Sequence, residues 1–179
     1  LRRTLGYLPQ DFGVYPRIDA ITLQDANGVT LARRAGAPLQ VARAGGPLAI
    51  VVEAYDQSDG NAARRKLGLY KVGYQILDAA GTPLPGYEQP LMNIEFNRLP
   101  PDRESVQVAY ARDSGITVYG SATTRFLYVV TNVVRDGAAR TGSWNPAPLS
   151  PGDYVVRIYA ADFAGNVALA GRDLPIRIE

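Results

Sequence analysis

Residues 149–161 read LSPGDYVVRIYAA and carry the strongest structural signal in the chain. A Pro-Gly turn, in which proline fixes φ and glycine permits unusual φ, leads into alternating apolar and polar residues. Alternation with a period of two is typical of a half-buried β-strand, so Val156 and Ile158 are predicted to point inward and Arg157 outward. Tyr154 is predicted to form a structural corner, in which its hydroxyl bonds to the backbone a few residues upstream.

The rest of the chain also has the sequence pattern of short β-strands. Short apolar runs separated by Gly, Pro, Asn and Asp are the pattern of an all-β protein. A nearly continuous apolar run at residues 48–55 predicts a central strand with both faces covered. Residues 102–112 have helix-like spacing, although their segment 106–110 fits a strand equally well. The predicted strands are 17–23, 29–33, 48–55, 70–77, 126–134, 154–161 and 174–178.

Together these signals predict an all-β fold, an elaborated immunoglobulin/fibronectin-III-like β-sandwich. In that assignment residues 48–55 are strand B and residues 154–161 are the penultimate strand, F. Residues 78–148 are too long for a minimal connection, so extra strands are expected between strands C and F. Residues 1–14 show little periodicity and are predicted to be an N-terminal arm or linker, which leaves residues 15–179 as the sandwich domain.

Composition narrows the classes of function. Of the 179 residues, 46% are hydrophobic and 20% are charged, which suits a globular protein. The chain has no His and no Cys, which excludes Ser-His-Asp and Cys-His catalysis and the usual zinc ligands. The net charge is +2 with scattered cations, and the cluster at residues 64–66 lies in a predicted loop, so no nucleic-acid partner is expected. No apolar run is long enough to cross a bilayer, and the start at Leu1 without Met indicates a processed or truncated piece.

Carboxylates are the remaining catalytic candidates. A pair of carboxylates can cleave a glycoside, and Glu53, Asp56, Glu95 and Asp162 are the available groups. The sequence gives no reason to pair any two of them, and each is interpreted as a solvated carboxylate at a strand end or edge. We therefore expect no catalytic residue within this chain.

Two segments of the chain have similar sequences. Residues 53–61 read EAYDQSDGN and residues 159–166 read YAADFAGN, so each is a strand that ends in Asp and turns at Gly-Asn. If these are strands B and F, their exit loops share one end of the sandwich, and Asp56, Asp59 and Asp162 could converge on a calcium ion. The alternative, which we favour, is that each Asp accepts N–H groups within its own turn, because neither loop has the dense carboxylate spacing of a calcium loop.

Trp144 is the only tryptophan and lies within the elaborated region. Loops on a rigid scaffold often carry binding, so its ring could contact a partner or a glycan. The favoured interpretation is that it covers the bottom of a sheet, because large aromatic rings are mostly buried.

Three segments resemble a known family: 67–75 (LGLYKVGYQ), 126–132 (FLYVVTN) and 151–166 (PGDYVVRIYAADFAGN). They look like the immunoglobulin-like region that follows the catalytic domain in some bacterial exported zinc peptidases of the M23 (lysostaphin-like) type. The resemblance covers roughly residues 15–179. It implies an extracytoplasmic protein, periplasmic, envelope-bound or secreted, that acts near peptidoglycan. It does not imply catalysis here, because that family's zinc ligands lie in HxxxD and HxH motifs and this chain has no His.

The expected function is therefore a non-catalytic accessory or interaction domain of an exported bacterial multidomain protein, attached to a cell-wall peptidase. Its expected partners are the adjacent catalytic domain of the same polypeptide and, further, peptidoglycan or another envelope protein. The alternative is a free-standing glycan- or protein-binding module of the adhesin type, with exposed tyrosines and Trp144 contacting carbohydrate. No cofactor is expected, although calcium stays open as a stabilising ion.

Overall fold

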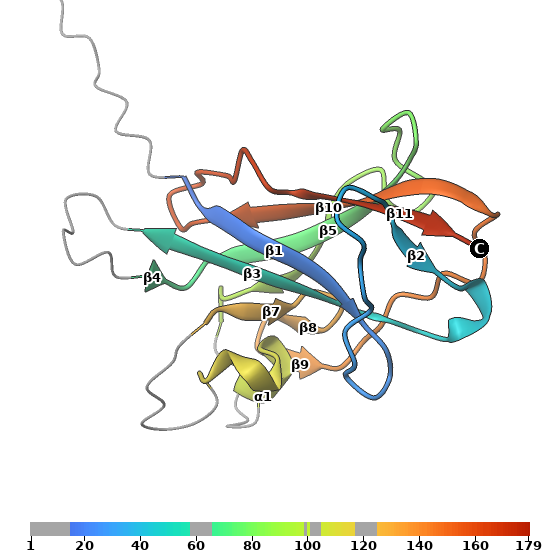
Figure 1. The fold of residues 1–179 in the computed structure, drawn as a ribbon. Helices are drawn as coiled ribbons and strands as arrows, with labels where there is room; N and C mark the ends of the chain where they lie inside the picture. The colour runs from blue at the N-terminus through green and yellow to red at the C-terminus, as the bar shows by residue number, and fades with distance from the viewer. Residues whose placement is uncertain (1–14, 58–65, 99, 101–104, 117–124) are drawn as a thin grey trace, which may run out of the picture.

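The strands of this chain form two β-sheets that face each other (Figure 1). A computed structural model describes residues 15–57, 66–98, 100, 105–116 and 125–179. Within them, the first sheet has the order β1-β3-β4 with β7 also paired to β3, and the second has the order β2-β11-β10-β5-β6-β8-β9. The first sheet consists of β1 (Arg17–Gln24), β3 (Ala49–Gln57), β4 (Lys66–Leu67) and β7 (Leu127–Val129). The second consists of β2 (Leu39–Val41), β5 (Lys71–Asp78), β6 (Leu91–Glu95), β8 (Val133–Arg135), β9 (Ala138–Arg140), β10 (Gly152–Ala161) and β11 (Asp173–Ile178).

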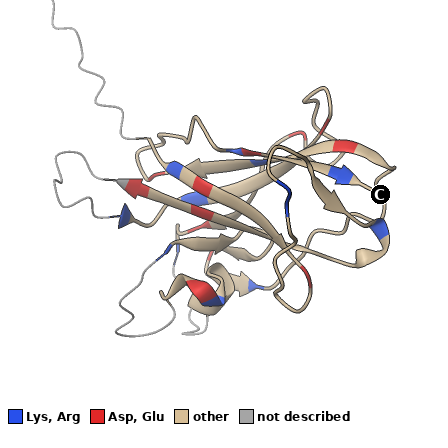
Figure 2. Ribbon diagram, in the orientation of Figure 1, with Lys and Arg blue, Asp and Glu red and all other residues tan. Residues whose placement is uncertain are grey.

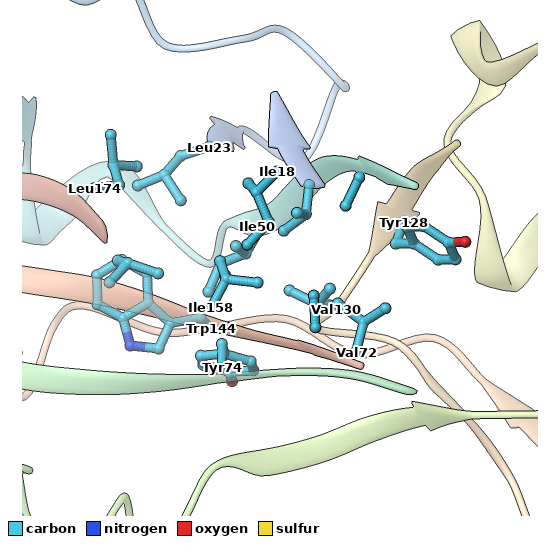
Figure 3. Packing of buried hydrophobic residues seen from close by; sticks show 14 of the residues in the cluster. Ile18, Leu23, Ile50, Val72, Tyr74, Tyr128, Val130, Trp144, Ile158 and Leu174 are labelled. Carbon is cyan, nitrogen blue, oxygen red and sulfur yellow. The ribbon is translucent and has the colours of Figure 1, made fainter. Parts of the chain in front are cut away.

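An apolar core lies between the two sheets and is built from buried side chains of both (Figure 3). In β11 burial alternates along the whole strand, so Leu174 and Ile176 are buried while Arg177 stays exposed. Ile50 of the first sheet and Ile158 of the second are fully or almost fully buried and belong to the same core. The all-β sandwich predicted from the sequence is confirmed.

The longest strands, β3 and β10, lie inside their sheets. In the described residues β3 lies between β1 and β7, and β10 lies between β5 and β11. Strands β6 to β9 come between β5 and β10 along the chain, where the sequence predicts extra strands.

Residues 126–134 are predicted as one central strand, and that prediction is wrong. β7 ends at Val129 and pairs with β3, whereas β8 pairs with β6 in the other sheet. Between the two strands, the Asn132 N–H bonds back to the Val129 carbonyl. The Asn132 side chain donates to the Val108 carbonyl and accepts the Gly142 N–H, each at 2.8 Å. These bonds fix a turn through which the chain passes from one sheet to the other.

Two shorter segments also differ from the sequence predictions. Residues 29–33 form no strand: after a turn in which the Asp25 carboxylate accepts backbone N–H groups, Thr30 makes only an isolated bridge with Gln24. Within residues 102–112 the helical alternative holds at the centre, where α1 (Ser105–Ala109) forms, while residues 102–104 lie outside the described part of the chain.

The helical elements are all short. Besides α1, the described residues contain the 3-10 turns η1 (Arg43–Gly45) and η2 (Arg112–Ser114). No helix in the described part of the chain has the length and apolar character needed to cross a membrane.

Four long strands meet at one end of the sandwich, which we call the loop end (residues 15–17, 55–57, 66–71 and 161–172). β1 begins there opposite the end of β3, with Arg17 paired to Tyr55. β5 begins there opposite the end of β10, with Lys71 paired to Ala161. Figure 1 shows these strand ends on the left and the C-terminus on the opposite side of the molecule.

Candidate functional site

The Tyr154 hydroxyl donates a hydrogen bond to the Ser150 carbonyl, four residues upstream, at 3.1 Å. This is the contact expected of a structural corner at that position. The ring is partly buried and packs against the core. Tyr154 therefore helps to fix the start of β10 on the scaffold, at the end of the sandwich opposite the loop end.

Trp144 is a core residue. It is only 3% exposed, and its backbone N–H and carbonyl pair with those of Leu48 at 2.8 Å in both directions. Its side chain is also hydrogen-bonded to Tyr87. A ring so enclosed has no face left for a ligand, so the proposal of Trp144 as a binding residue is wrong and the covering role is the one observed.

Of the three aspartates proposed for calcium, Asp59 lies outside the described residues, so their convergence stays a prediction. Both carboxylate oxygens of Asp162 accept bonds from Asn166, one from its backbone N–H at 2.8 Å and one from its side-chain amide at 2.7 Å. Asp56 lies near the end of β3 opposite Leu67, and Asp59 lies outside the described residues. In the part of the chain that the structure describes, no cluster of three or more His, Cys, Asp or Glu residues has metal-binding geometry.

The other candidate carboxylates are engaged in ion pairs. Glu53 on β3 accepts two bonds from the Arg125 guanidinium, and that hydrogen bonding lowers the pKa of the Glu53 carboxyl. Glu95 on β6 pairs with Lys71 at 2.9 Å and with Arg135 at 3.9 Å. Side chains held in this way are suited to joining strands.

An aromatic pair at the loop end, the exposed Phe163 against the half-buried Tyr70, is the feature that the sequence analysis missed. Phe163, in the turn after β10, is 84% exposed, the largest value among the exposed large apolar residues described. Its ring meets Tyr70 edge to face, with centroids 5.1 Å apart and an interplanar angle of 80°. Such pairs contribute about 0.5–1.5 kcal/mol beyond area burial.

The backbone around this pair is well fixed. The Tyr70 N–H bonds to the Ala161 carbonyl, and the Tyr70 carbonyl accepts the Phe96 N–H, both at 3.0 Å. On the other side, the turn that carries Phe163 is closed by the Asp162 N–H, which donates to the Asn166 carbonyl, and by the Asn166 N–H, which donates to the Asp162 carboxylate. The same Asx turn that the sequence predicted for Asp162 thus presents an aromatic ring to solvent.

β10 and the segment that follows its turn carry two further exposed large side chains. Tyr159 of β10 is 37% exposed and Leu169 is 63% exposed. The Ala168 N–H bonds to the Ala160 carbonyl at 2.9 Å, which places the neighbouring residues Leu169 and Tyr159 at adjacent positions of the same hairpin. We call Tyr70, Tyr159, Phe163 and Leu169 the end patch.

Two lysines at the loop end are held in ion pairs. Lys71 binds Glu95 and lies 5.5 Å from the centre of the Tyr70 ring, and the bond to Glu95 raises the pKa of the Lys71 amine. Lys66 lies 4.0 Å from the Tyr55 ring centre and pairs with Asp19 at 3.5 Å. In Figure 2 positive and negative residues are interspersed over both sheets. The end patch therefore lies beside ion-paired lysines and beside the exposed arginines Arg17 and Arg172.

One sequence signal pointed to this surface. The turn that ends the second of the two similar segments, DFAGN, places a large aromatic residue directly after the capping Asp, where small or polar residues are usual.

Comparison with known proteins does not assign the chain to a family: no family model matches the sequence, and no curated protein matches it significantly.

Proposed function

We propose that this chain is a non-catalytic accessory domain of an exported bacterial multidomain protein, joined to a cell-wall peptidase of the M23 type. It acts outside the cytoplasm and binds a partner through the end patch. The resemblance of residues 67–75, 126–132 and 151–166 to the region beside such peptidases supports the context. The β-sandwich supports the role, because it holds loops in fixed positions.

The observation that carries the proposal is the exposure of Phe163 on a hydrogen-bonded turn. An aromatic ring left in water costs free energy that contact with a partner recovers, and aromatic residues are enriched at interaction hot spots. Phe163 contacts Tyr70, and Tyr159 and Leu169 are further exposed side chains of the same hairpin, so Phe163 is not an isolated apolar residue.

The ion pairs of the candidate carboxylates support a role without catalysis. A general acid needs a raised pKa, as a carboxyl in an apolar site has, whereas the Arg125 pair lowers the pKa of Glu53. Glu95 is likewise held between two cations. These carboxylates join strands to neighbouring segments of the fold.

The test of this function uses the purified chain and insoluble peptidoglycan. We expect no release of soluble fragments or of new amino groups by the chain alone. Release by the longer polypeptide encoded upstream of Leu1, and its loss when that upstream region is deleted, is the supporting result. Turnover by the 179-residue chain alone, abolished by Glu53→Gln, overturns the proposal.

A free-standing glycan-binding module is the second candidate, and the aromatic character of the end patch favours it. Aromatic faces stack on sugars, and three of the four patch residues are aromatic. A glycan array separates the two candidates: binding that disappears in Phe163→Ala but persists in Val29→Ala supports the glycan module. Val29 is a suitable control because it is 61% exposed and lies in the turn beyond the far end of β1.

A further inference from the structure

Met92 carries the only sulfur atom of the chain, which has one methionine and no cysteine. It lies on β6 and is partly buried. Methionine is flexible and polarizable, so it fills irregular gaps in a fold, and its thioether is a common target of oxidants. Oxidation at sulfur in this chain is therefore confined to one position, and the surroundings of that position decide what the oxidation does.

The Met92 sulfur occupies space that the absence of a side chain at Gly73 leaves open. A Cβ atom on Gly73 would lie 2.8 Å from this sulfur and 2.5 Å from the Leu91 carbonyl oxygen. Gly73 lies where the pairing of β5 with β6 is irregular, between Val72 and Tyr74. Such irregularities re-aim side chains of the bulged strand. The sulfur thus packs against the backbone of β5 at the point where the two strands are least regularly paired.

β6 links two parts of the second sheet. It pairs with β5 on one side and with β8 on the other, and β8 pairs in turn with β9. The Met92 carbonyl accepts a bond from the Arg135 guanidinium at 3.1 Å. The Asn93 side-chain amide donates to the Val130 carbonyl at 2.9 Å. A change at Met92 therefore acts where the β8–β9 hairpin is attached to the rest of the sheet.

We propose that Met92 is an oxidation site, at which a peroxide converts the thioether to a sulfoxide and thereby loosens β6 from β5. With hydrogen peroxide, a sulfur lone pair attacks one peroxide oxygen, an S–O bond forms, the O–O bond breaks and water leaves. The sulfur loses two electrons and the peroxide gains them. The oxidant reaches the sulfur because Met92 is only partly buried.

The sulfoxide does not suit the space beside Gly73. Oxidation turns an apolar group into a larger, polar and chiral one. Its new oxygen is an acceptor, and the Leu91 carbonyl oxygen that borders the same space is an acceptor as well, so the two cannot bond to each other. The oxidised side chain therefore turns toward solvent, and the contact between β6 and the β5 backbone is lost.

The test treats the purified 179-residue chain with hydrogen peroxide. Mass spectrometry of the peptide that contains Met92 follows the gain of one oxygen atom. We expect the melting temperature of the oxidised chain to fall by about 2–4 °C. Amide hydrogen exchange should become faster in β6 and β8 but stay unchanged in β11, because β11 lies on the far side of β10. Treatment with methionine sulfoxide reductases should restore both properties.

Two variants separate this effect from general oxidative damage. Met92→Leu keeps the volume and the apolar character but cannot be oxidised, so its melting temperature should not respond to peroxide. Met92→Gln places a polar oxygen at the same position, and it should melt below Met92→Leu without any peroxide.

Three outcomes overturn the proposal. In the first, Met92 stays unoxidised at a peroxide concentration that fully converts free methionine. In the second, oxidation is complete but the melting temperature and the exchange of β6 are unchanged. In the third, peroxide lowers the melting temperature of Met92→Leu as much as that of the wild type, which assigns the effect to another residue.

Discussion

The hydroxyl of Tyr128 accepts the backbone N–H of Leu69 at 2.7 Å, and both residues are buried. This bond ties β7 of the first sheet to the segment that leads from β4 into β5 of the second. The Tyr128 ring also packs against Tyr110, with ring centroids 5.0 Å apart, so the bonded hydroxyl lies within an aromatic cluster.

Removing this acceptor should destabilise the protein. Tyr128→Phe leaves the Leu69 N–H buried without a partner, which costs about 1–3 kcal/mol. Urea denaturation measures the loss as a lower midpoint with an unchanged slope. Tyr159→Phe, which removes a partly exposed hydroxyl, is the control and should leave the midpoint unchanged. Equal midpoints for Tyr128→Phe and the wild type would show that the bond contributes nothing.

Gly73 has no room for a side chain. A Cβ atom there would lie 2.5 Å from the Leu91 carbonyl oxygen and 2.8 Å from the Met92 sulfur, where the pairing of β5 with β6 is irregular. Gly73→Ala must therefore displace β6, at a cost of about 1–3 kcal/mol. Gly45→Ala is the matched control, because its nearest neighbour, the Ala42 Cβ, is at an ordinary 3.7 Å. Thermal unfolding of the two variants should differ by several degrees.

The Glu53–Arg125 pair predicts a specific dependence on pH. Folding lowers the pKa of Glu53, so the ionised carboxylate stabilises the folded state above the ordinary value of 4.5. That stabilisation is lost as the pH falls through the lowered pKa. Relative to the wild type, Glu53→Gln should be destabilised at pH 7, and the difference in free energy of unfolding should shrink toward pH 3. A difference that stays constant from pH 7 to pH 3 would exclude the ion pair as its source.

The single tryptophan provides an optical check on the assignment of Trp144 to the core. Because the ring is 3% exposed, its native fluorescence should resist acrylamide quenching, and adding oligosaccharides should leave the emission unchanged. Trp144→Ala should lose about 3–5 kcal/mol of stability, as large core truncations do. Strong quenching of the native protein contradicts the buried position.

Calcium should have no effect on the melting temperature. Both Asp162 oxygens are already used by Asn166, so a metal would have to break the turn that it is supposed to stabilise. Scanning calorimetry in calcium and in EDTA makes the comparison. A rise with calcium that disappears in Asp162→Asn would restore the metal site.

Much of the fold follows from local pattern, because one-sided burial forces a period of two. β11 alternates strictly and β10 alternates through its centre, and both are predicted almost to their ends. The division of residues 126–134 is not predictable in this way. Its apolar residues are buried on both sides of the turn, so the pattern carries no mark of the point at which the chain changes sheets. That point depends on Asn132 meeting Val108 and Gly142, which are distant along the chain.

The sequence predicted the end of the sandwich at which the candidate site lies, but it did not predict which side chains form the site. Sequence reasoning placed the exits of 48–55 and 154–161 at one end, and it concentrated on the aspartates there. Asp162 does form its own turn, as the favoured interpretation states. The exposure of Phe163 escaped notice because exposure depends on what the rest of the fold leaves uncovered, which no local pattern records.

The crossing between β7 and β8 has a mechanical consequence. A few consecutive residues belong first to one layer and then to the other, and the turn between them is tied to α1 through Asn132. The two sheets therefore cannot separate or unfold one after the other without breaking this turn. Unfolding of either sheet should therefore unfold the other in a single cooperative transition. Circular dichroism and tryptophan emission should give the same unfolding curve.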